Sequence, residues 1–147
     1  MIRDYLSYSS FDLFRRDPDS WVLRYVYDLS QPTTPKMALG KIFSEAYAQS
    51  TYDVAKAVQG ANLTPQEASM VTKALADPLL IRPAPEWCEY KLENVVNGIP
   101  LLAFLDALDK DNESDTIVEN KTGATWNQER ADTSDQLTLY SIVYDSL

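Results

Sequence analysis

Asp106, Glu119 and Lys121 are the residues of this chain whose types and spacing could do chemistry. Asp106 lies in an otherwise apolar segment, where a carboxylate without compensation is energetically costly. Two carboxylates can hold a divalent cation with waters completing its shell, and a neighbouring ammonium can orient or activate a water molecule. A buried salt bridge is equally compatible with this spacing, so the elements that position the three residues matter.

Asp106 is placed by a predicted β-hairpin. Apolar and β-branched residues predict strands over 87–96 and 99–108, and Asn97-Gly98 between them is a favoured two-residue turn. Because successive side chains of a strand point to opposite faces, Asp106 is expected on one face together with Leu102, Phe104 and Leu108.

Glu119 and Lys121 belong to a third predicted strand, over 115–121. They are two positions apart and therefore share a face of that strand. If the second and third strands are neighbours, the two carboxylates and the ammonium meet at one place. The sequence then predicts a site for a divalent cation beside a lysine.

Helices are predicted on both sides of these strands. Capping residues and apolar residues at helical spacing predict them over 11–16, 19–27, 36–58, 65–76 and 135–144. Thr64-Pro65-Gln66-Glu67 has the form of a capping box, and residues 122–133 are expected to form a loop. N-terminal helices, a three-stranded mainly antiparallel sheet and a C-terminal helix indicate an α/β fold in an α+β arrangement, as one domain over residues 1–147.

The absence of histidine and the presence of one cysteine, Cys88, exclude several kinds of site. Ser-His-Asp triads, Cys-His nucleophiles and histidine-ligated zinc are excluded, and so are an intrachain disulfide and a four-cysteine zinc or iron–sulfur site. A lone cysteine between Trp87 and Glu89 is more often a small core residue than a nucleophile. Chemistry through carboxylates, lysine and oxygen-binding metals remains.

The formal net charge of −9 argues against a protein that coats nucleic acid by bulk electrostatics. Contacts to a phosphate backbone are expected from the N-terminal part, which contains Arg3, Arg15, Arg16, Arg24, Lys36 and Lys41. No apolar run reaches the roughly 18 residues of a membrane helix. The N-terminus also lacks the layout of a signal peptide. We therefore expect a cytoplasmic protein without membrane contact.

Four segments carry a resemblance to a known family. Ala103-Phe104-Leu105-Asp106 precedes Glu119-Asn120-Lys121-Thr122-Gly123, and Gln136-Leu137-Thr138-Leu139-Tyr140 follows. Near the N-terminus, Ser7-Tyr8-Ser9-Ser10-Phe11 is followed by Pro18 and Trp21. In order and spacing, over nearly the whole chain, these segments resemble the motifs of the PD-(D/E)XK nuclease superfamily, in particular its RecB-like and phage recombination exonuclease branch.

The resemblance implies a restriction-endonuclease-like core and a deoxyribonuclease that depends on Mg²⁺ or Mn²⁺. Asp106 and Glu119 would ligate the metal together with the backbone carbonyl of Asn120, and Lys121 would position the attacking water. Gln136 and Tyr140, four residues apart on one helix face, would look toward the lysine and the DNA. An ordinary amphipathic helix would explain the same pair.

Three departures from the family pattern are present. RecB-like members usually have a histidine as an additional metal ligand where this chain has Ser44, which argues against a second bound ion. Glu45 is then either a substitute ligand or a solvated side chain, and Glu89, at the place of a frequent family glutamate, is either close to the metal ligands or simply exposed. Iron–sulfur members have a cysteine in place of Asp17, so no such cluster is expected. The family core normally continues with another strand after the last helix, so the resemblance leads us to expect either a fragment or a sheet that another chain completes.

The favoured hypothesis is an exonuclease that hydrolyses DNA phosphodiester bonds in recombination or repair, of phage or mobile-element type. An endonuclease is the nearest alternative, and a homo-oligomer or a recombination partner protein would assist DNA binding. A catalytically silent module of a larger DNA-processing assembly belongs to a different class, and an acidic protein that imitates DNA has only the net charge in its favour. Asp106, Glu119 and Lys121 favour the nuclease, because lost chemistry leaves no reason to keep two carboxylates facing a core.

Overall fold

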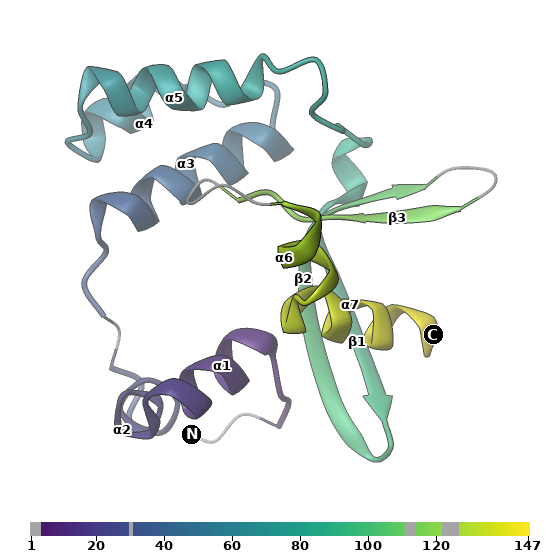
Figure 1. Cartoon of the computed structure of the whole chain (residues 1–147). Coiled ribbons are helices and arrows are strands. Elements are labelled where there is room, and N and C mark those ends of the chain that lie inside the picture. Colours follow the sequence, from purple (N-terminus) through teal and green to yellow (C-terminus); the bar gives the residue numbers. More distant parts are fainter. Residues whose placement is uncertain (1–3, 30, 111–113, 122–126) are drawn as a thin grey trace. The chain divides into compact units, whose positions relative to one another are not determined.

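A β-hairpin followed by a third strand forms the sheet of this computed structural model (Figure 1). Strands β1 (Cys88–Val96), β2 (Ile99–Lys110) and β3 (Asp115–Val118) lie in the order β1-β2-β3. Helices precede and follow the sheet along the chain, so the predicted α+β arrangement is confirmed. The structure describes residues 4–29, 31–110, 114–121 and 127–147, and the motif residues Thr122 and Gly123 lie outside them.

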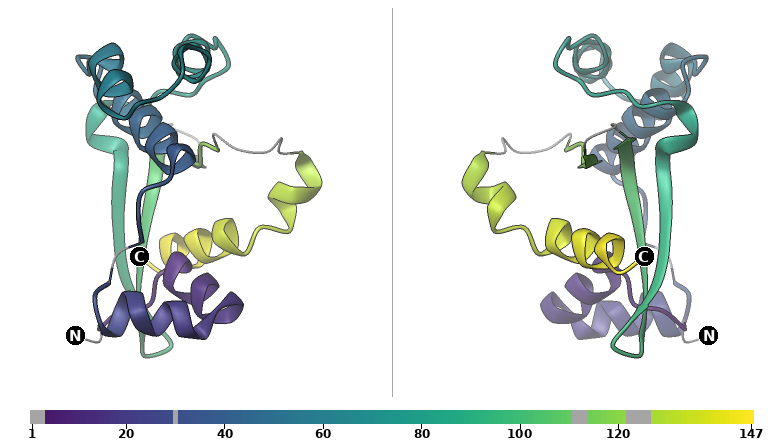
Figure 2. Two further views of the ribbon diagram at one scale, coloured as in Figure 1. Left: turned by 90° about the vertical axis from the view of Figure 1, so that its left-hand side faces the viewer. Right: turned by 90° about the vertical axis from the view of Figure 1, so that its right-hand side faces the viewer.

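The hairpin turn consists of Asn97 and Gly98, as predicted. Both residues have positive φ angles, 51° and 79°. This left-handed pair is what a type I′ turn requires, and its twist matches that of the flanking strands. Figure 2 shows the two strands side by side, joined at this turn.

Gly98→Ala is expected to lower the free energy of unfolding by about 1 kcal/mol, because a Cβ is disfavoured at a left-handed position. Among the described residues, no heavy atom lies within 4 Å of the place such a Cβ would take, so the backbone angle alone is responsible. Gly60, the last residue of α4 (Val54–Gly60), has equally open surroundings without a positive φ. Gly60→Ala should therefore raise the free energy of unfolding by about 0.5 kcal/mol. Urea unfolding of both variants tests this, and a loss of stability in both would contradict it.

β2 is the central strand and is buried on both faces along much of its length. Ala103, Leu105, Ala107 and Leu108 are almost inaccessible to solvent. Phe104, predicted to share a face with Asp106, is 55% exposed. Period-two alternation assigns a face to each side chain, but it does not say how far other elements cover that face.

β3 pairs with the end of β2 in antiparallel register, with Ala107 opposite Val118. The strand ends at Val118, although the sequence predicted it to reach Lys121. The backbone N–H of Asn120 instead donates a hydrogen bond to Oδ2 of Asp106, on the neighbouring strand, at 2.6 Å. Glu119, Asn120 and Lys121 thus leave the strand and remain beside Asp106.

The helices are α1 (Tyr8–Arg16), α2 (Pro18–Trp21), α3 (Pro35–Ala48), α4 (Val54–Gly60), α5 (Pro65–Leu75), α6 (Gln128–Asp132) and α7 (Asp135–Asp145). A π-helical segment, Val22–Val26, continues α2, and Trp87 ends a short 3₁₀ turn and does not begin a strand. The capping box of Thr64 and Glu67 is present as predicted, and Ser134 caps α7. Within the part of the chain that the structure describes, no helix is both long and apolar enough to cross a bilayer.

Two predictions about helices are wrong. The helix expected over 36–58 is broken, since α3 ends at Ala48 and α4 begins at Val54. Asp53 accepts a hydrogen bond from the backbone N–H of Lys56 at 3.0 Å, and this cap starts a new helix. Similarly, α6 lies inside the loop expected over 122–133, with Asn127 as its cap.

The chain divides into two compact units, each made of distant segments. The first unit comprises Met1–Pro32, Lys91–Phe104 and Asn127–Leu147, and the second comprises Thr33–Tyr90 and Leu105–Trp126. Strands β1 and β2 contribute to both. The expectation of one nuclease domain over residues 1–147 stays a prediction.

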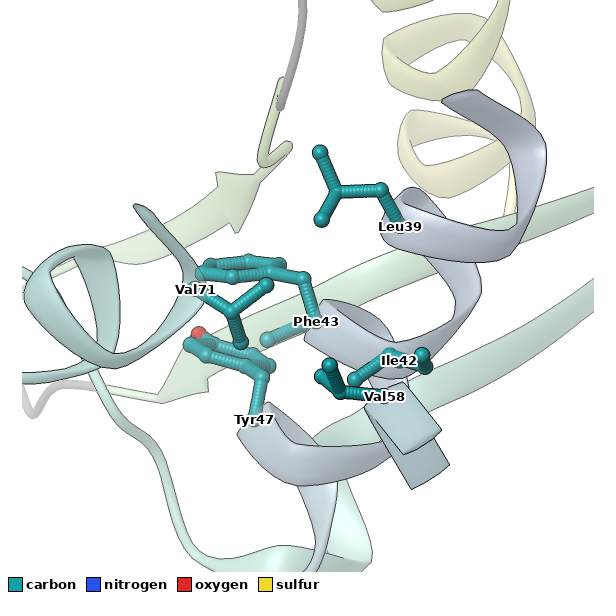
Figure 3. Packing of buried hydrophobic residues seen from close by; sticks show 7 residues of the cluster. Leu39, Ile42, Phe43, Tyr47, Val58 and Val71 are labelled. Carbon is teal, nitrogen blue, oxygen red and sulfur yellow. The ribbon is translucent and has the colours of Figure 1, made fainter. Parts of the chain in front are cut away.

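In the second unit, α3, α4 and α5 pack around one core (Figure 1). Leu39, Phe43 and Tyr47 project from one side of α3, with Val71 of α5 beside Phe43 and Tyr47 (Figure 3). Ala107 of β2 belongs to the same cluster, and Cys88 is half-buried against it, as expected of a small core residue. This core therefore fixes α3 relative to the part of β2 that contains Asp106.

In the first unit, α7 packs against α1 (Figure 2). Arg15 of α1 and Asp135 of α7 form an ion pair at 3.0 Å. Trp21 donates a hydrogen bond from Nε1 to the buried hydroxyl of Ser10 at 2.9 Å. Aromatic and polar side chains thus join the N-terminal helices to one another.

Candidate active site

The residues singled out for chemistry lie together in the second unit. Asp106 of β2 and residues 119–121, after β3, line one cavity of about 280 Å³. Lys41 and Ser44 of α3 line the same cavity. The predicted convergence of Asp106, Glu119 and Lys121 is therefore found, although Glu119 and Lys121 follow the strand and are not part of it.

Asp106 is partly buried, and burial raises the pKa of its carboxyl group. The hydrogen bond from the Asn120 N–H and the charge of the Lys121 ammonium act in the opposite direction, while the Glu89 carboxylate raises the pKa further. An ionised carboxylate in this position is held by one directed hydrogen bond and gains from any added positive charge. The surroundings of the Asp106 carboxylate therefore suit a ligand of a cation.

Glu119 and Lys121 form an ion pair between Oε1 and Nζ. The Glu119 side chain is only 10% exposed, whereas the Lys121 side chain is 31% exposed, so the carboxylate is shielded and the ammonium is still open to solvent. The salt bridge considered from the spacing is therefore present. The pair contributes one ammonium to a cavity to which Asp106 and Glu119 contribute carboxylates.

Ser44 of α3 donates a hydrogen bond from Oγ to Oε1 of Glu89 at 3.1 Å. Glu89 has a φ of 48°, a left-handed conformation that is rare for a residue with a long side chain and typical of functional regions. Glu89 is exposed, and its charge still acts on Asp106. These contacts favour the interpretation that Glu89 lies close to the candidate metal ligands.

Glu45 is engaged elsewhere. Its carboxylate accepts a hydrogen bond from the hydroxyl of Tyr52 and lies 3.8 Å from Nζ of Lys41. The hydrogen bond to Glu45, together with burial, raises the pKa of Tyr52 to about 12. Glu45 does not line the cavity of Asp106, so the interpretation as a substitute ligand finds no support.

Glu45→Gln is expected to bring the pKa of Tyr52 back toward its ordinary value, because the neutral phenol loses a charged acceptor. In the wild type, the stability contributed by this hydrogen bond is fully present below the ordinary tyrosine pKa of about 10. It is lost as the pH rises through about 12. Ultraviolet absorbance titration should show a late-titrating tyrosine that disappears in Tyr52→Phe and shifts to lower pH in Glu45→Gln. Identical titration curves for wild type and Glu45→Gln would contradict the assignment.

Tyr47 supports the site from the core, a role that the sequence did not indicate because Tyr47 lies in the apolar stripe of α3. Its hydroxyl donates a hydrogen bond to the carbonyl oxygen of Ile81 at 2.5 Å. Burial raises the pKa of Tyr47, and a hydrogen bond from the Asn120 side chain counteracts this shift. Tyr47 therefore joins the core of α3 to the segment that contains Glu119 and Lys121.

Gln136 and Tyr140 lie on α7 in the first unit. Nε2 of Gln136 donates a hydrogen bond to the Tyr140 hydroxyl at 2.7 Å, and Tyr140 is buried. Gln136 also lines a polar cavity of about 510 Å³ together with Arg16 and Arg24. The burial of Tyr140 fits an amphipathic helix, whereas Gln136 in a polar cavity fits a functional role, so the role of the pair stays a prediction.

The oxygen donors around Asp106 fit a hard divalent cation. Mg²⁺ is usually held by one or two carboxylates and several waters. Among the described residues, no cluster of three or more His, Cys, Asp or Glu side chains could hold a metal ion alone, so water or backbone oxygens would complete the shell. Cys88 does not line this cavity, and a soft thiolate is in any case a poor ligand for such a cation.

Comparison with known proteins gives a match to a family. The sequence model of the PD-(D/E)XK nuclease superfamily matches residues 5–147, and neither a curated protein nor a solved structure matched the chain. Nucleases of this superfamily generally use divalent metals such as Mg²⁺, in agreement with the carboxylate donors. The match spans the N-terminal helices, the sheet and the last helix, and the chain therefore belongs to the PD-(D/E)XK nuclease superfamily, which indicates a nuclease.

Proposed function

We propose that this protein is a divalent-metal-dependent DNA nuclease whose active centre contains Asp106, Glu119 and Lys121. The observation that carries this proposal is the common cavity of two shielded carboxylates and one ammonium within a nuclease fold. Asp106 and Glu119 would hold Mg²⁺ or Mn²⁺, together with the backbone carbonyl of Asn120. The bound ion would supply Lewis acidity toward the phosphate.

Neighbouring residues hold the Asp106 carboxylate and the Lys121 ammonium in the positions that hydrolysis would require. The Asn120 N–H fixes the orientation of the Asp106 carboxylate, and Glu119 holds the Lys121 ammonium inside the cavity. From that position Lys121 orients the attacking water and offsets the charge that develops on the phosphate. Lys41 lines the same cavity and offers a second cation to the phosphate backbone.

Local contacts must provide the DNA affinity, because the chain has a net charge of −9. Arg16, Arg24 and Gln136 line one polar cavity, and we place contacts to the DNA backbone there. Gln136 and Tyr140 would contribute to catalysis, as the family motif implies. A homo-oligomer or a recombination partner protein would add contacts.

Within this class, the order of the motifs supports an exonuclease of the RecB-like and phage branch, acting in recombination or repair inside the cytoplasm. The competing hypothesis of a catalytically silent module draws on Ser44 in place of the family histidine. The hydrogen bond from Ser44 to Glu89, next to an intact set of two carboxylates and a lysine, supports the active enzyme.

Incubation with end-labelled linear DNA and with closed circular DNA, in Mg²⁺ or Mn²⁺, tests the proposal. The linear DNA should be degraded from its ends while the closed circle stays intact, and EDTA should stop the reaction. Cutting of the circle would replace the exonuclease by an endonuclease. Stable linear DNA in both metals would favour the silent module.

A further inference from the structure

A second cavity of the second unit shares part of its wall with the candidate active site. Its volume is about 300 Å³. Phe43, Asn120 and Lys121 line both cavities. The rest of the second cavity is mainly apolar, with Met70 of α5 and Leu79 of the following segment among its lining residues. An apolar cavity thus begins at the proposed catalytic lysine.

The side chains that form the wall of this cavity are packed against the core of the second unit. Phe43 and Val71 are buried, and the Phe43 ring stacks on that of Tyr47 with 6.1 Å between the centroids. Figure 3 shows Phe43 and Val71 close together below Leu39, which also lines the cavity. These side chains belong to the core, so they form a fixed apolar surface.

Two large apolar side chains at this cavity are open to solvent. Leu79 is 87% exposed and Met70 is 51% exposed. The backbone of Leu79 is nevertheless fixed, since its N–H donates a hydrogen bond to Oδ1 of Asp77 at 2.9 Å. The Leu80 N–H donates to the carbonyl oxygen of Asp77 at 3.1 Å. A turn that holds an exposed leucine beside a cavity leaves apolar surface available to a ligand.

We propose that this cavity binds an unpaired nucleobase of the DNA strand whose phosphate lies at Asp106, Glu119 and Lys121. The inference rests on the proposed nuclease function. A nucleotide joins a charged phosphate to a flat, largely apolar base, and the two cavities offer these two environments across a shared wall. Bases bind to apolar and aromatic side chains through their faces without sequence preference.

The proposal also predicts which kind of DNA is the preferred substrate. A base inside a duplex is paired and stacked, and taking it out costs free energy that is smallest when the nucleotide is already single-stranded. The cavity therefore favours single-stranded DNA or an unpaired strand end over the interior of a duplex. Among the described residues that line this cavity, Asp77 is the one polar side chain outside the wall shared with the active site, so we expect little sequence preference.

Binding of two strands that differ only in their bases tests the proposal in the full chain. The probes are a fluorescent oligothymidylate of about 12 nucleotides and an abasic deoxyribose-phosphate strand of equal length. Anisotropy is measured with Ca²⁺ in place of Mg²⁺. Ala74, an exposed residue of α5 that lines the cavity, is replaced by tryptophan to fill it. Ala55→Trp, at an exposed site of α4, is the matched control.

The wild type should bind oligothymidylate about tenfold more tightly than the abasic strand. Ala74→Trp should reduce this preference to near one and leave the affinity for the abasic strand unchanged. Ala55→Trp should behave as the wild type. Leu79→Ser, which removes an exposed side chain and so preserves folding, should reduce the preference as well, which keeps the test valid if Ala74→Trp does not fold.

Equal affinity of the wild type for the two strands would overturn the proposal. It would also be overturned if Ala74→Trp and Leu79→Ser kept the full preference, as expected if a protein partner occupies the cavity, or if both variants weakened binding of both strands alike. The outcome that would refute the proposed nuclease function differs from the outcomes that would refute the nucleobase site. A preserved preference for bases without cleavage in any divalent metal would refute the nuclease and leave the nucleobase site standing.

Discussion

Asp106→Asn is expected to lower the rate of DNA hydrolysis by about 10³-fold, since a ligand to a catalytic cation contributes several kcal/mol to stabilisation of the transition state. The substitution keeps the shape of the side chain, and the amide oxygen can still accept the hydrogen bond from the Asn120 N–H. The loss should therefore reflect the missing charge and not a rearranged site. Single-turnover cleavage of end-labelled DNA in saturating Mn²⁺ measures it.

The same variant should unfold at an equal or higher temperature than the wild type. Burial raises the pKa of Asp106, so ionisation of this group weakens the folded state as the pH rises through that pKa. A neutral amide removes this cost at pH values where the wild-type carboxylate is charged. Thermal unfolding of both proteins in EDTA near neutral pH tests the direction of the change in unfolding temperature.

Asp109→Asn is the matched control for Asp106→Asn. Asp109 lies on the same strand and is half-buried, but it does not line the cavity. Its substitution should leave the cleavage rate close to that of the wild type. Equal activity of Asp106→Asn and Asp109→Asn would refute the assigned role, and an equal loss in both would point to a general effect on β2.

Lys121→Met is expected to lower the cleavage rate by roughly 10²- to 10⁴-fold, the usual contribution of a group that handles a proton or orients the nucleophile. Methionine retains an unbranched side chain but removes the ammonium that pairs with Glu119. Binding of DNA in Ca²⁺ should change much less, because the lysine acts mainly in the transition state. The rate and the affinity are measured on the same oligonucleotide.

Lys91→Met is the control, because Lys91 pairs with Glu93 at 2.6 Å with the same two-residue spacing on an exposed part of the chain. It should cleave DNA at the wild-type rate. Lys121→Arg should recover part of the activity if positive charge is the main requirement. A Lys121→Met variant with full activity would rule out the assigned mechanism.

Those parts of the fold that depend on neighbouring residues could be predicted from the sequence. Asn97 and Gly98 adopt the left-handed pair that their turn needs, and Thr64 and Glu67 form their capping box. The convergence of Asp106 with Glu119 and Lys121 also followed, because it required only that β2 and β3 pair. The strand pairing was enough to predict that the carboxylates are neighbours, although Glu119 and Lys121 follow β3 and are not part of it.

Other features depend on tertiary contacts that spacing does not contain. The end of β3 is set by the hydrogen bond from Asn120 to Asp106, and Glu45 is drawn to Tyr52. Tyr47 belongs to an apolar stripe in sequence, and only its position in the core brings its hydroxyl near Asn120. In each case a polar partner distant in sequence determined the outcome, and hydrophobic periodicity carries no information about such a partner.

Binding of Mn²⁺, followed by electron paramagnetic resonance, tests the central claim that Asp106 and Glu119 together hold a divalent cation. The wild type should bind the ion, and Asp106→Ala and Glu119→Gln should each weaken binding by at least about tenfold, the loss typical of changes even in groups that only support metal ligands. Asp109→Asn should bind Mn²⁺ as the wild type does. Unchanged Mn²⁺ affinity in both Asp106→Ala and Glu119→Gln would contradict the claim.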